Sequence, residues 1–215
     1  ETDVNVLMGT KGILRSCISP AAPVAKCVRV TYDTTVLFDE MSNGGGIACD
    51  IENAVRMNAD CMAVQTFIGA PGESRSLELL CRTADAGARY GIPTLGVVAV
   101  GKQMERTEKF FQLATRVLAE NGANVVKSYY CDGFERVAAA CPVPIVIAGG
   151  KKLPELEALE MAYRAIAEGA RGVDMGRNIF QSDCPAGMAQ AIGKVVHGGY
   201  TAQQAFEVYQ EIKNA

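Results

Sequence analysis

A lysine in the middle of an apolar run is the residue in this sequence most suited to covalent chemistry. Lys127 stands within Val125-Val126-Lys127-Ser128-Tyr129, a stretch that we expect to form a strand buried on both faces. Burying an ammonium group is costly, so a lysine in such a place gives up its proton more easily. A neutral amine can attack a carbonyl carbon and form an imine, which draws electrons from the neighbouring carbon–carbon bond. Lys127 is therefore a candidate Schiff-base catalyst.

The composition around Lys127 supports a second interpretation equally well. A lysine near a strand end can bury its aliphatic stem and extend its charged head to water, without any catalytic role. Tyr129 lies two residues further on, so its side chain and that of Lys127 point to the same face of the strand. Tyr129 is a candidate proton donor, although packing is the commoner role of a buried tyrosine.

Two glycine turns form a candidate phosphate site. Gly149-Gly150 ends one apolar run, and Gly176-Arg177 ends the next. Glycines let backbone N–H groups approach an anion, and an arginine adds a charged fork. In β/α barrels, phosphate groups commonly bind at the loops after the last two strands. The alternative is that these glycines only turn the chain, but two such sites on successive runs favour phosphate binding.

Several other polar residues are weaker candidates. Lys151-Lys152 could add positive charge, but a solvated loop is the better interpretation. Arg29 lies inside an apolar run and could face a barrel interior or pair with a carboxylate on a helix, and the sequence does not decide between these. The single histidine, His197, precedes two glycines at an expected helix end, where a cation suits the helix dipole. Asn43–Gly46 has no strand directly before it, so we interpret it as a flexible loop.

Short apolar runs alternate with amphipathic segments along the chain. This pattern is typical of an α/β fold in which parallel strands are covered on both faces by helices. The runs that we predict to be strands are residues 4–8, 27–32, 61–68, 94–100, 125–130, 144–148 and 172–176.

The amphipathic segments carry helix start and stop signals. Gly91 and Gly122 each follow a periodic stretch and predict its end. Pro154 is expected at the first helical position of the next stretch. Thr201 and Gln204 have the spacing of a capping box. The predicted helices cover residues 77–90, 107–120 and 155–168, with a last one beginning at Thr201.

Seven strands in βα alternation, with no linker, predict one domain over residues 1–215 with the fold of a TIM (β/α)8 barrel. Such a barrel uses eight strands and about 250 residues. The sequence opens almost directly on a strand and ends with two helices. We therefore expect the first strand to be missing from this chain, or its place to be covered by a neighbouring chain.

The composition excludes several classes of protein. A formal net charge of −3 argues against a nucleic-acid partner, and no run reaches the roughly 18 apolar residues that cross a membrane. The eight cysteines are scattered without a CxxC pair, and one histidine cannot complete a zinc set. We expect a reduced, cytoplasmic protein with no structural metal.

The sequence resembles the class I aldolase superfamily of deoxyribose-phosphate aldolase and the archaeal-type fructose-bisphosphate aldolases. Within it, the chain most resembles the thiolases that act on 3-hydroxy-5-phosphonooxypentane-2,4-dione, and the likeness covers nearly the whole chain. The segments that carry it are Gly12–Ser16, Val126–Tyr130 with Gly133–Arg136, Cys141–Glu155 and Gly172–Asp183.

The resemblance implies a Schiff-base role for Lys127 and a phosphate site at Gly149, Gly150, Gly176 and Arg177. It also implies a homo-oligomer, a decamer in related enzymes. The implied reaction transfers an acetyl group from the phosphorylated dione to coenzyme A and leaves dihydroxyacetone phosphate. No motif for coenzyme A is legible in the sequence, and no bound cofactor is expected.

This chain departs from the superfamily pattern at two places. The family has an upstream strand that ends in Asp-His-Gly and reaches the substrate, and this chain has no counterpart, which leaves the acid/base partner of Lys127 open. The archaeal aldolases carry a tryptophan and a tyrosine on the strand before the lysine strand, whereas Gly96–Val100 carries neither. The second departure favours a thiolase-like substrate.

Three alternatives to the thiolase remain. A sugar-phosphate aldolase is the nearest, followed by a synthase that joins a ketose-derived fragment to an amino-acid aldehyde. The third is a phosphosugar-binding scaffold without catalysis. Only an enzyme would form a borohydride-trappable adduct at Lys127, so trapping separates the scaffold from the rest.

Overall fold

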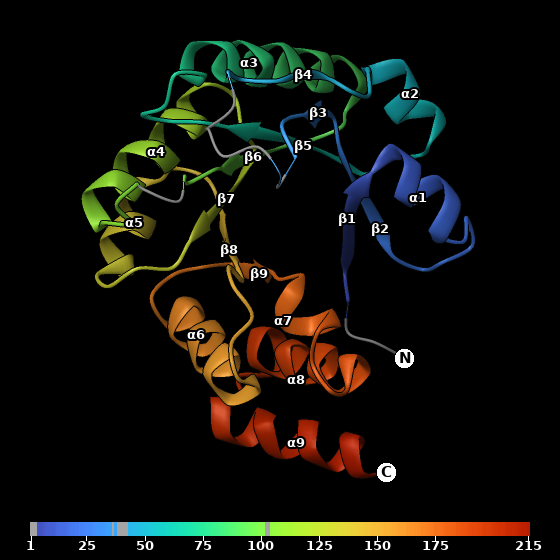
Figure 1. The fold of residues 1–215 in the computed structure, drawn as a ribbon, viewed down its shortest axis with the longest axis vertical. Coiled ribbons are helices and arrows are strands. Elements are labelled where there is room, and N and C mark those ends of the chain that lie inside the picture. Colours follow the sequence, from blue (N-terminus) through green and yellow to red (C-terminus); the bar gives the residue numbers. More distant parts are fainter. Residues whose placement is uncertain (1–3, 36, 38–42, 102–103) are drawn as a thin grey trace. The chain divides into compact units, whose positions relative to one another are not determined.

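Seven of the strands lie in one sheet, and they follow one another in the sheet as they do in the chain (Figure 1). The computed structural model describes residues 4–35, 37, 43–101 and 104–215. The pairs β1–β2, β2–β5, β5–β6 and β8–β9 are parallel. The strands of this sheet are β1 (Val6–Thr10), β2 (Ala25–Arg29), β5 (Cys61–Thr66), β6 (Thr94–Val98), β7 (Val125–Tyr129), β8 (Ile145–Ala148) and β9 (Gly172–Asp174).

Helices connect these strands, so the predicted α/β class and the sequential strand order of a β/α barrel are confirmed. Gly91 and Gly122 have the expected positive φ angles of 72° and 100° at helix ends. The helices are α1 (Lys11–Cys17), α2 (Ile51–Arg56), α3 (Glu73–Tyr90), α4 (Glu108–Glu120), α5 (Phe134–Ala140), α6 (Glu155–Ala167), α7 (Arg177–Phe180), α8 (Pro185–Gly198) and α9 (Ala202–Asn214).

Three local predictions need correction. Residues 27–32 do not form one strand, because the Val30 carbonyl accepts a hydrogen bond from Ala48 N (2.7 Å) and the chain leaves the sheet there. The next two residues form β3 (Thr31–Tyr32), which pairs antiparallel with β4 (Gly46–Ile47), so the end of the glycine-rich loop is a strand. Pro154 is the N-cap of α6, with extended backbone, rather than its first helical residue.

The described chain divides into two compact units. The amino-terminal unit is Asn5–Arg106 with Leu113–Val126, and the carboxy-terminal unit is Thr107–Gln112 with Lys127–Ala215 and Val4. The boundaries fall inside α4 and β7, so each of these elements contributes to both units. The expectation of a single domain over residues 1–215 stays a prediction.

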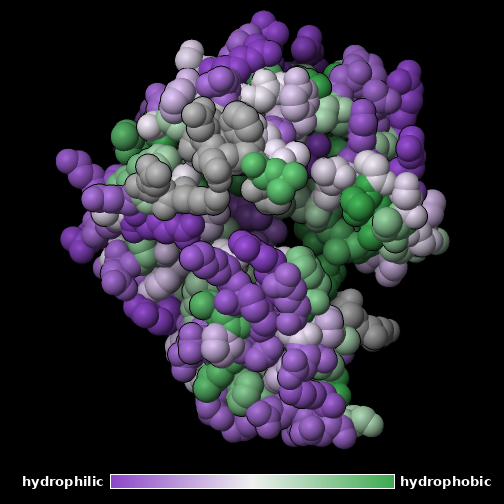
Figure 2. Space-filling model, viewed as in Figure 1, coloured by the Kyte–Doolittle hydropathy of each residue, from purple (hydrophilic) through white to green (hydrophobic). Residues whose placement is uncertain are grey.

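In the amino-terminal unit, α3 contacts β5 and buries one face. Leu79 and Leu80 are buried there, while charged residues cover the opposite face of the helix, which is mostly hydrophilic in Figure 2. Gly87 of α3 lies against this strand, because a Cβ built there would be 3.1 Å from Met62 Cε. The side of β5 that carries Met62 therefore faces the helix.

In the carboxy-terminal unit, α6, α8 and α9 contact one another around a shared apolar core. Leu159, Met188 and Tyr209 are buried in it, and small residues such as Ala162 and Ala205 let the helices approach closely. The predicted capping box is present at the start of α9: Gln204 N donates to Thr201 Oγ1 (3.3 Å), and Thr201 N donates to Gln204 Oε1 (3.0 Å). Met175, directly after β9, belongs to this core, and Val173 of β9 packs against it, so the core reaches the strand that carries Asp174.

Among the described residues, no helix has the length and apolar character to span a membrane. No disulfide joins any of the eight cysteines, all of which lie among the described residues.

Candidate active site

Strand β7 has one covered face and one partly open face. Val126 and Ser128 are fully buried, whereas Lys127 and Tyr129 are only partly buried and share the other face, as the two-residue spacing predicts. The expectation of a strand buried on both faces is therefore wrong here. The open face is the one that a substrate could reach.

The amine of Lys127 is paired with a carboxylate. Its Nζ lies 3.0 Å from Oδ2 of Asp174, and the side chains are 14% and 25% exposed. Asp174 is the last residue of β9 and is in register with Ala148 of β8. Side chains of residues in register point to the same side of a sheet, so the Ala148 and Asp174 side chains lie on the same side. Strand β8 lies between β7 and β9, and the small Ala148 side chain leaves room for the Lys127 side chain to reach Asp174.

This pairing supplies a partner that the sequence analysis left open, since no acid/base partner of Lys127 was identified there. The sequence analysis quoted Asp174 within a family segment but did not identify it as a site residue. A signal was present, because a carboxylate at the carboxyl end of a barrel strand is well placed for catalysis. Its partner depends on strand register, which the sequence does not give. A carboxylate at this distance can hold the amine in place and exchange a proton with it.

The first glycine turn is shaped by close packing. Gly149 is buried, and a Cβ built there would lie 2.9 Å from Asn178 Nδ2 and 3.0 Å from Met175 Cγ. Gly150 has a φ of 65°, which favours glycine, and lies near Tyr129, whose Cε1 would be 4.0 Å from an added Cβ. The first glycine turn and the open face of β7 are therefore neighbours.

Asn178 joins the two glycine turns, and sequence reasoning did not identify it. Its side chain is fully buried. Asn178 Nδ2 donates to the Gly149 carbonyl (2.7 Å), and Asn178 Oδ1 accepts from Leu153 N (2.8 Å). Because Asn178 directly follows Gly176-Arg177, these bonds hold the turn after β9 against the loop after β8. The four predicted phosphate-site residues are thus brought together.

Gly176 and Arg177 are on the exposed side of this arrangement. Gly176 caps the short helix α7, and Arg177 is its first residue. Arg177 has no ion pair in the part of the chain that the structure describes. Its guanidinium is therefore available to a ligand at these turns.

The neighbouring lysines contribute less, as expected. Lys152 Nζ donates to Glu155 Oε1 (2.7 Å) and to the Leu153 carbonyl (2.8 Å), and this bond keeps the pKa of the Glu155 carboxyl below its usual range. Its charge is thus compensated within the protein. Lys151 is exposed. His197 lies in the last turn of α8, as the sequence predicts.

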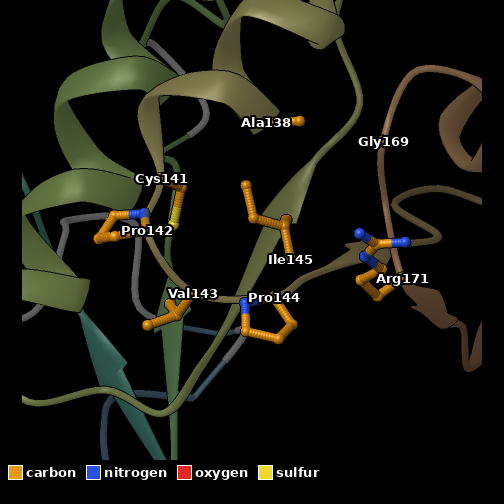
Figure 3. A pocket seen from close by; sticks show the side chains of 8 residues that line it. All are labelled: Ala138, Cys141, Pro142, Val143, Pro144, Ile145, Gly169 and Arg171. Atoms are coloured by element: carbon orange, nitrogen blue, oxygen red, sulfur yellow. The ribbon is translucent and has the colours of Figure 1, made fainter.

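A surface cavity in the same unit lies at the other end of the strands. It has a volume of about 270 Å³, and Figure 3 shows the side chains around it, among them Ile145 and Arg171. Ile145 begins β8 and Arg171 directly precedes β9, so the cavity is at the amino ends of strands whose carboxyl ends carry the candidate site. None of the candidate site residues lines it.

Known proteins have similar sequences along nearly the whole chain. The chain is 52% identical over 214 residues to a 3-hydroxy-5-phosphonooxypentane-2,4-dione thiolase of Enterobacter sp. (strain 638), an alignment that covers 99% of this chain and 71% of the relative. It is 51% identical over 210 residues to an uncharacterised aldolase of Pasteurella multocida, which covers 97% of this chain and 72% of that protein.

Solved structures share the fold. An archaeal fructose 1,6-bisphosphate aldolase matches with a TM-score of 0.79 at 24% identity, covering 90% of this chain and 78% of that one. A fructose-bisphosphate aldolase from Slackia heliotrinireducens matches with a TM-score of 0.83 at 20% identity, covering 96% and 72%. The profile of the DeoC/LacD family aldolases matches residues 22–182. With this match and relatives at about half identity along nearly its whole length, the chain belongs to the DeoC/LacD family of aldolases.

Proposed function

We propose that this protein is a Schiff-base enzyme that transfers an acetyl group from 3-hydroxy-5-phosphonooxypentane-2,4-dione to coenzyme A. The substrate is inferred from the thiolase relative at 52% identity over 214 residues. The mechanism is inferred from one observation: a lysine amine 3.0 Å from a carboxylate, on the open face of a strand beside two glycine turns. That is the set of groups that imine chemistry on a phosphorylated ketone requires.

In the proposed first step, the Lys127 amine attacks the substrate carbonyl next to the phosphate-bearing carbon. Asp174 first takes a proton from the Lys127 ammonium group, and after the neutral amine has attacked, a second proton moves from the nitrogen to the carbonyl oxygen, which becomes the hydroxyl of a carbinolamine. Asp174 then returns the proton to that hydroxyl, which leaves as water and gives the iminium. General acid–base help of this kind contributes about 10²- to 10⁴-fold to a rate.

The second step divides the substrate. The thiolate of coenzyme A attacks the acetyl carbonyl, and the bond between the acetyl carbon and the hydroxyl-bearing carbon breaks. Its electron pair moves toward the iminium and leaves an enamine on Lys127 with acetyl-coenzyme A as product. Protonation of the enamine carbon and hydrolysis of the resulting iminium release dihydroxyacetone phosphate and restore the lysine.

The phosphate group of the substrate is proposed to bind at Gly149, Gly150, Gly176 and Arg177. The backbone of both turns can present N–H groups, and Arg177 supplies a charge that has no ion-pair partner in the described chain. Such a site fixes one end of the substrate, so that its carbonyl meets Lys127 in a constant position.

Self-association and a cytoplasmic setting complete the proposal. Val6 and Met8 of β1 and Ile13 of α1 are 49%, 38% and 54% exposed, and apolar surface on adjacent elements suits an interface between copies. Eight free thiols suit a reducing compartment. Mass photometry of the purified protein tests the assembly, for which we expect a decamer; a monomer at micromolar concentration would refute this part.

Reductive trapping tests the central claim. Borohydride added with dihydroxyacetone phosphate should leave a covalent adduct on the peptide that contains Lys127. The adduct should be absent from Lys127→Met and present in Lys151→Met, which removes an exposed lysine of the same unit. An adduct on a different lysine, or turnover retained in Lys127→Met, would refute the mechanism.

A product assay separates the proposed reaction from its alternatives. Acetyl-coenzyme A should form only when coenzyme A and the phosphorylated dione are both supplied. Cleavage of fructose 1,6-bisphosphate without coenzyme A would instead identify a sugar-phosphate aldolase. Binding of dihydroxyacetone phosphate without any trapped adduct would identify a scaffold that lacks catalysis.

A further inference from the structure

The amino-terminal unit holds an arginine whose hydrogen-bond partner is a neutral side chain. Arg29 is the last residue of β2, and its Nη2 donates a hydrogen bond of 2.6 Å to Oε1 of Gln65 on β5. Gln65 is neutral, and no carboxylate pairs with Arg29 within residues 4–35, 37, 43–101 and 104–215. The sequence left open whether Arg29 pairs with a helix carboxylate, and the structure answers that its partner is an amide.

Arg29 also has a hydrogen-bond donor that is excluded from water. Its Nε is buried and has no hydrogen-bond partner in the part of the chain that the structure describes. Leaving a buried donor unpaired costs about 1–3 kcal/mol, and more for a charged group, so such an atom calls for an explanation. Arg29 as a whole is partly exposed, so a ligand that contacts its guanidinium would also bring an acceptor close to Nε.

Arg29 and Gln65 lie on the side of the sheet away from α3, and both are partly exposed. Arg29 is in register with Ala63, so both side chains point to the same side of the sheet. Met62 faces α3, and Ala63 and Gln65 alternate with it, so they lie on the side away from that helix. Arg29 is at the carboxyl end of its strand, the edge where ligands bind in parallel β/α folds.

The bond between Arg29 and Gln65 fixes the kind of ligand. A guanidinium has donors only, so Gln65 must turn its oxygen toward Arg29 and its NH₂ group away. The free surface of the pair then consists of N–H donors, and it carries one uncompensated positive charge. Such a surface suits an oxyanion and repels cations.

We propose that Arg29 and Gln65 form a binding site for an oxyanion, a phosphate or a carboxylate group of a metabolite. This site is separate in sequence and in unit from the turns at Gly149 and Gly176, and the inference does not depend on the proposed function. The Arg29 fork supplies the charge, and Gln65 both orients the fork and adds a neutral donor.

Thermal unfolding in increasing inorganic phosphate or acetate tests the site. The background for all measurements is Arg177→Met, which removes the charge from the other proposed phosphate site. In this background we expect phosphate, acetate or both to raise the Tm. Adding Arg29→Met should increase the half-saturating anion concentration at least tenfold. The matched control is Arg89→Met, which removes an exposed arginine of α3 in the same unit and should leave the anion response unchanged.

A second variant covers the case in which Arg29→Met does not fold. Gln65→Glu supplies a carboxylate to Arg29 inside the protein, so it should raise the Tm without anion and remove the response to anion. A response to neither anion in the Arg177→Met background, or an unchanged response after Gln65→Glu, would overturn the inference. Neither outcome changes the expected borohydride adduct at Lys127, so the anion site and the proposed function are tested independently of each other.

Discussion

Lys127 on β7 and Asp174 on β9 form a 3.0 Å ion pair across β8, the strand between their own. The small Ala148 side chain at the level of Asp174 makes this reach possible. The pair puts a nucleophile and a proton acceptor on the same open face, beside the turns that hold the predicted phosphate site. The predictions below test the pair and the packing that holds those turns.

Replacing Asp174 with asparagine should slow turnover about 10²- to 10⁴-fold, because the amide keeps the size of the side chain but cannot accept and return a proton as the carboxylate does. Borohydride trapping at Lys127 should become slower in proportion, while the fold is retained. Asp183→Asn is the control, since Asp183 is an exposed carboxylate of the same unit that pairs with Lys213. An unchanged trapping rate in Asp174→Asn would remove Asp174 from the mechanism.

Asn178→Ala should lower the free energy of unfolding by about 2–4 kcal/mol, because it leaves the Gly149 carbonyl and the Leu153 N–H without their partner. It should also weaken the binding of dihydroxyacetone phosphate, since the two turns would no longer be held together. Urea denaturation measures the first effect, and calorimetry the second. Asn214→Ala, at the exposed end of α9, should change neither. An unchanged affinity of Asn178→Ala for dihydroxyacetone phosphate would show that the two turns do not form the phosphate site.

Gly149→Ala should destabilise the protein by about 1–3 kcal/mol, the usual cost of forcing an extra carbon into packed surroundings. The new Cβ would lie 2.9 Å from Asn178 Nδ2 and 3.0 Å from Met175 Cγ. Gly12→Ala is the contrasting substitution, because a Cβ at Gly12 meets nothing within 4 Å and the residue lies in helix α1. Alanine there should stabilise by about 0.5–1 kcal/mol. Equal effects of the two substitutions in urea denaturation would contradict the packing described for Gly149.

Lys152→Met should lower the free energy of unfolding at neutral pH, and it should lower it less in acid. The hydrogen bond from Lys152 lowers the pKa of the Glu155 carboxyl below its ordinary value of 4.5. A lowered pKa in the folded state means that this stabilisation is fully present above pH 4.5 and is lost as the pH falls through the folded value. The loss at pH 7 should be about 0.5–1 kcal/mol, typical of a partly exposed pair.

The measurement for the Lys152 prediction is urea denaturation at pH 7 and pH 3. Lys151→Met serves as the control, because Lys151 is exposed and should have the same small effect at both values. If Lys152→Met lowers the free energy of unfolding as much at pH 3 as at pH 7, the bond to Glu155 is not the cause of the destabilisation.

The sequence by itself determined the elements and much of the site. Apolar runs and their spacing gave the sequential parallel strands, because burial between helices requires apolar residues wherever a strand is covered. Glycines at 91 and 122 and the capping box at Thr201 gave helix limits, because those signals act within a few residues. The two-residue spacing of Lys127 and Tyr129 was enough to place them on one face.

Only the tertiary structure decided which distant residues meet. Asp174 reaches Lys127, Asn178 holds Gly149, and Arg29 pairs with Gln65 through strand register and loop packing, neither of which local periodicity encodes. The same reason explains the break after Arg29, where the Val30 N–H still donates to Ala63 of β5 but the Val30 carbonyl accepts from Ala48 N, outside the seven-stranded sheet. Periodicity reports which side of an element is buried, whereas the identity of a partner depends on how separate elements are aligned in space.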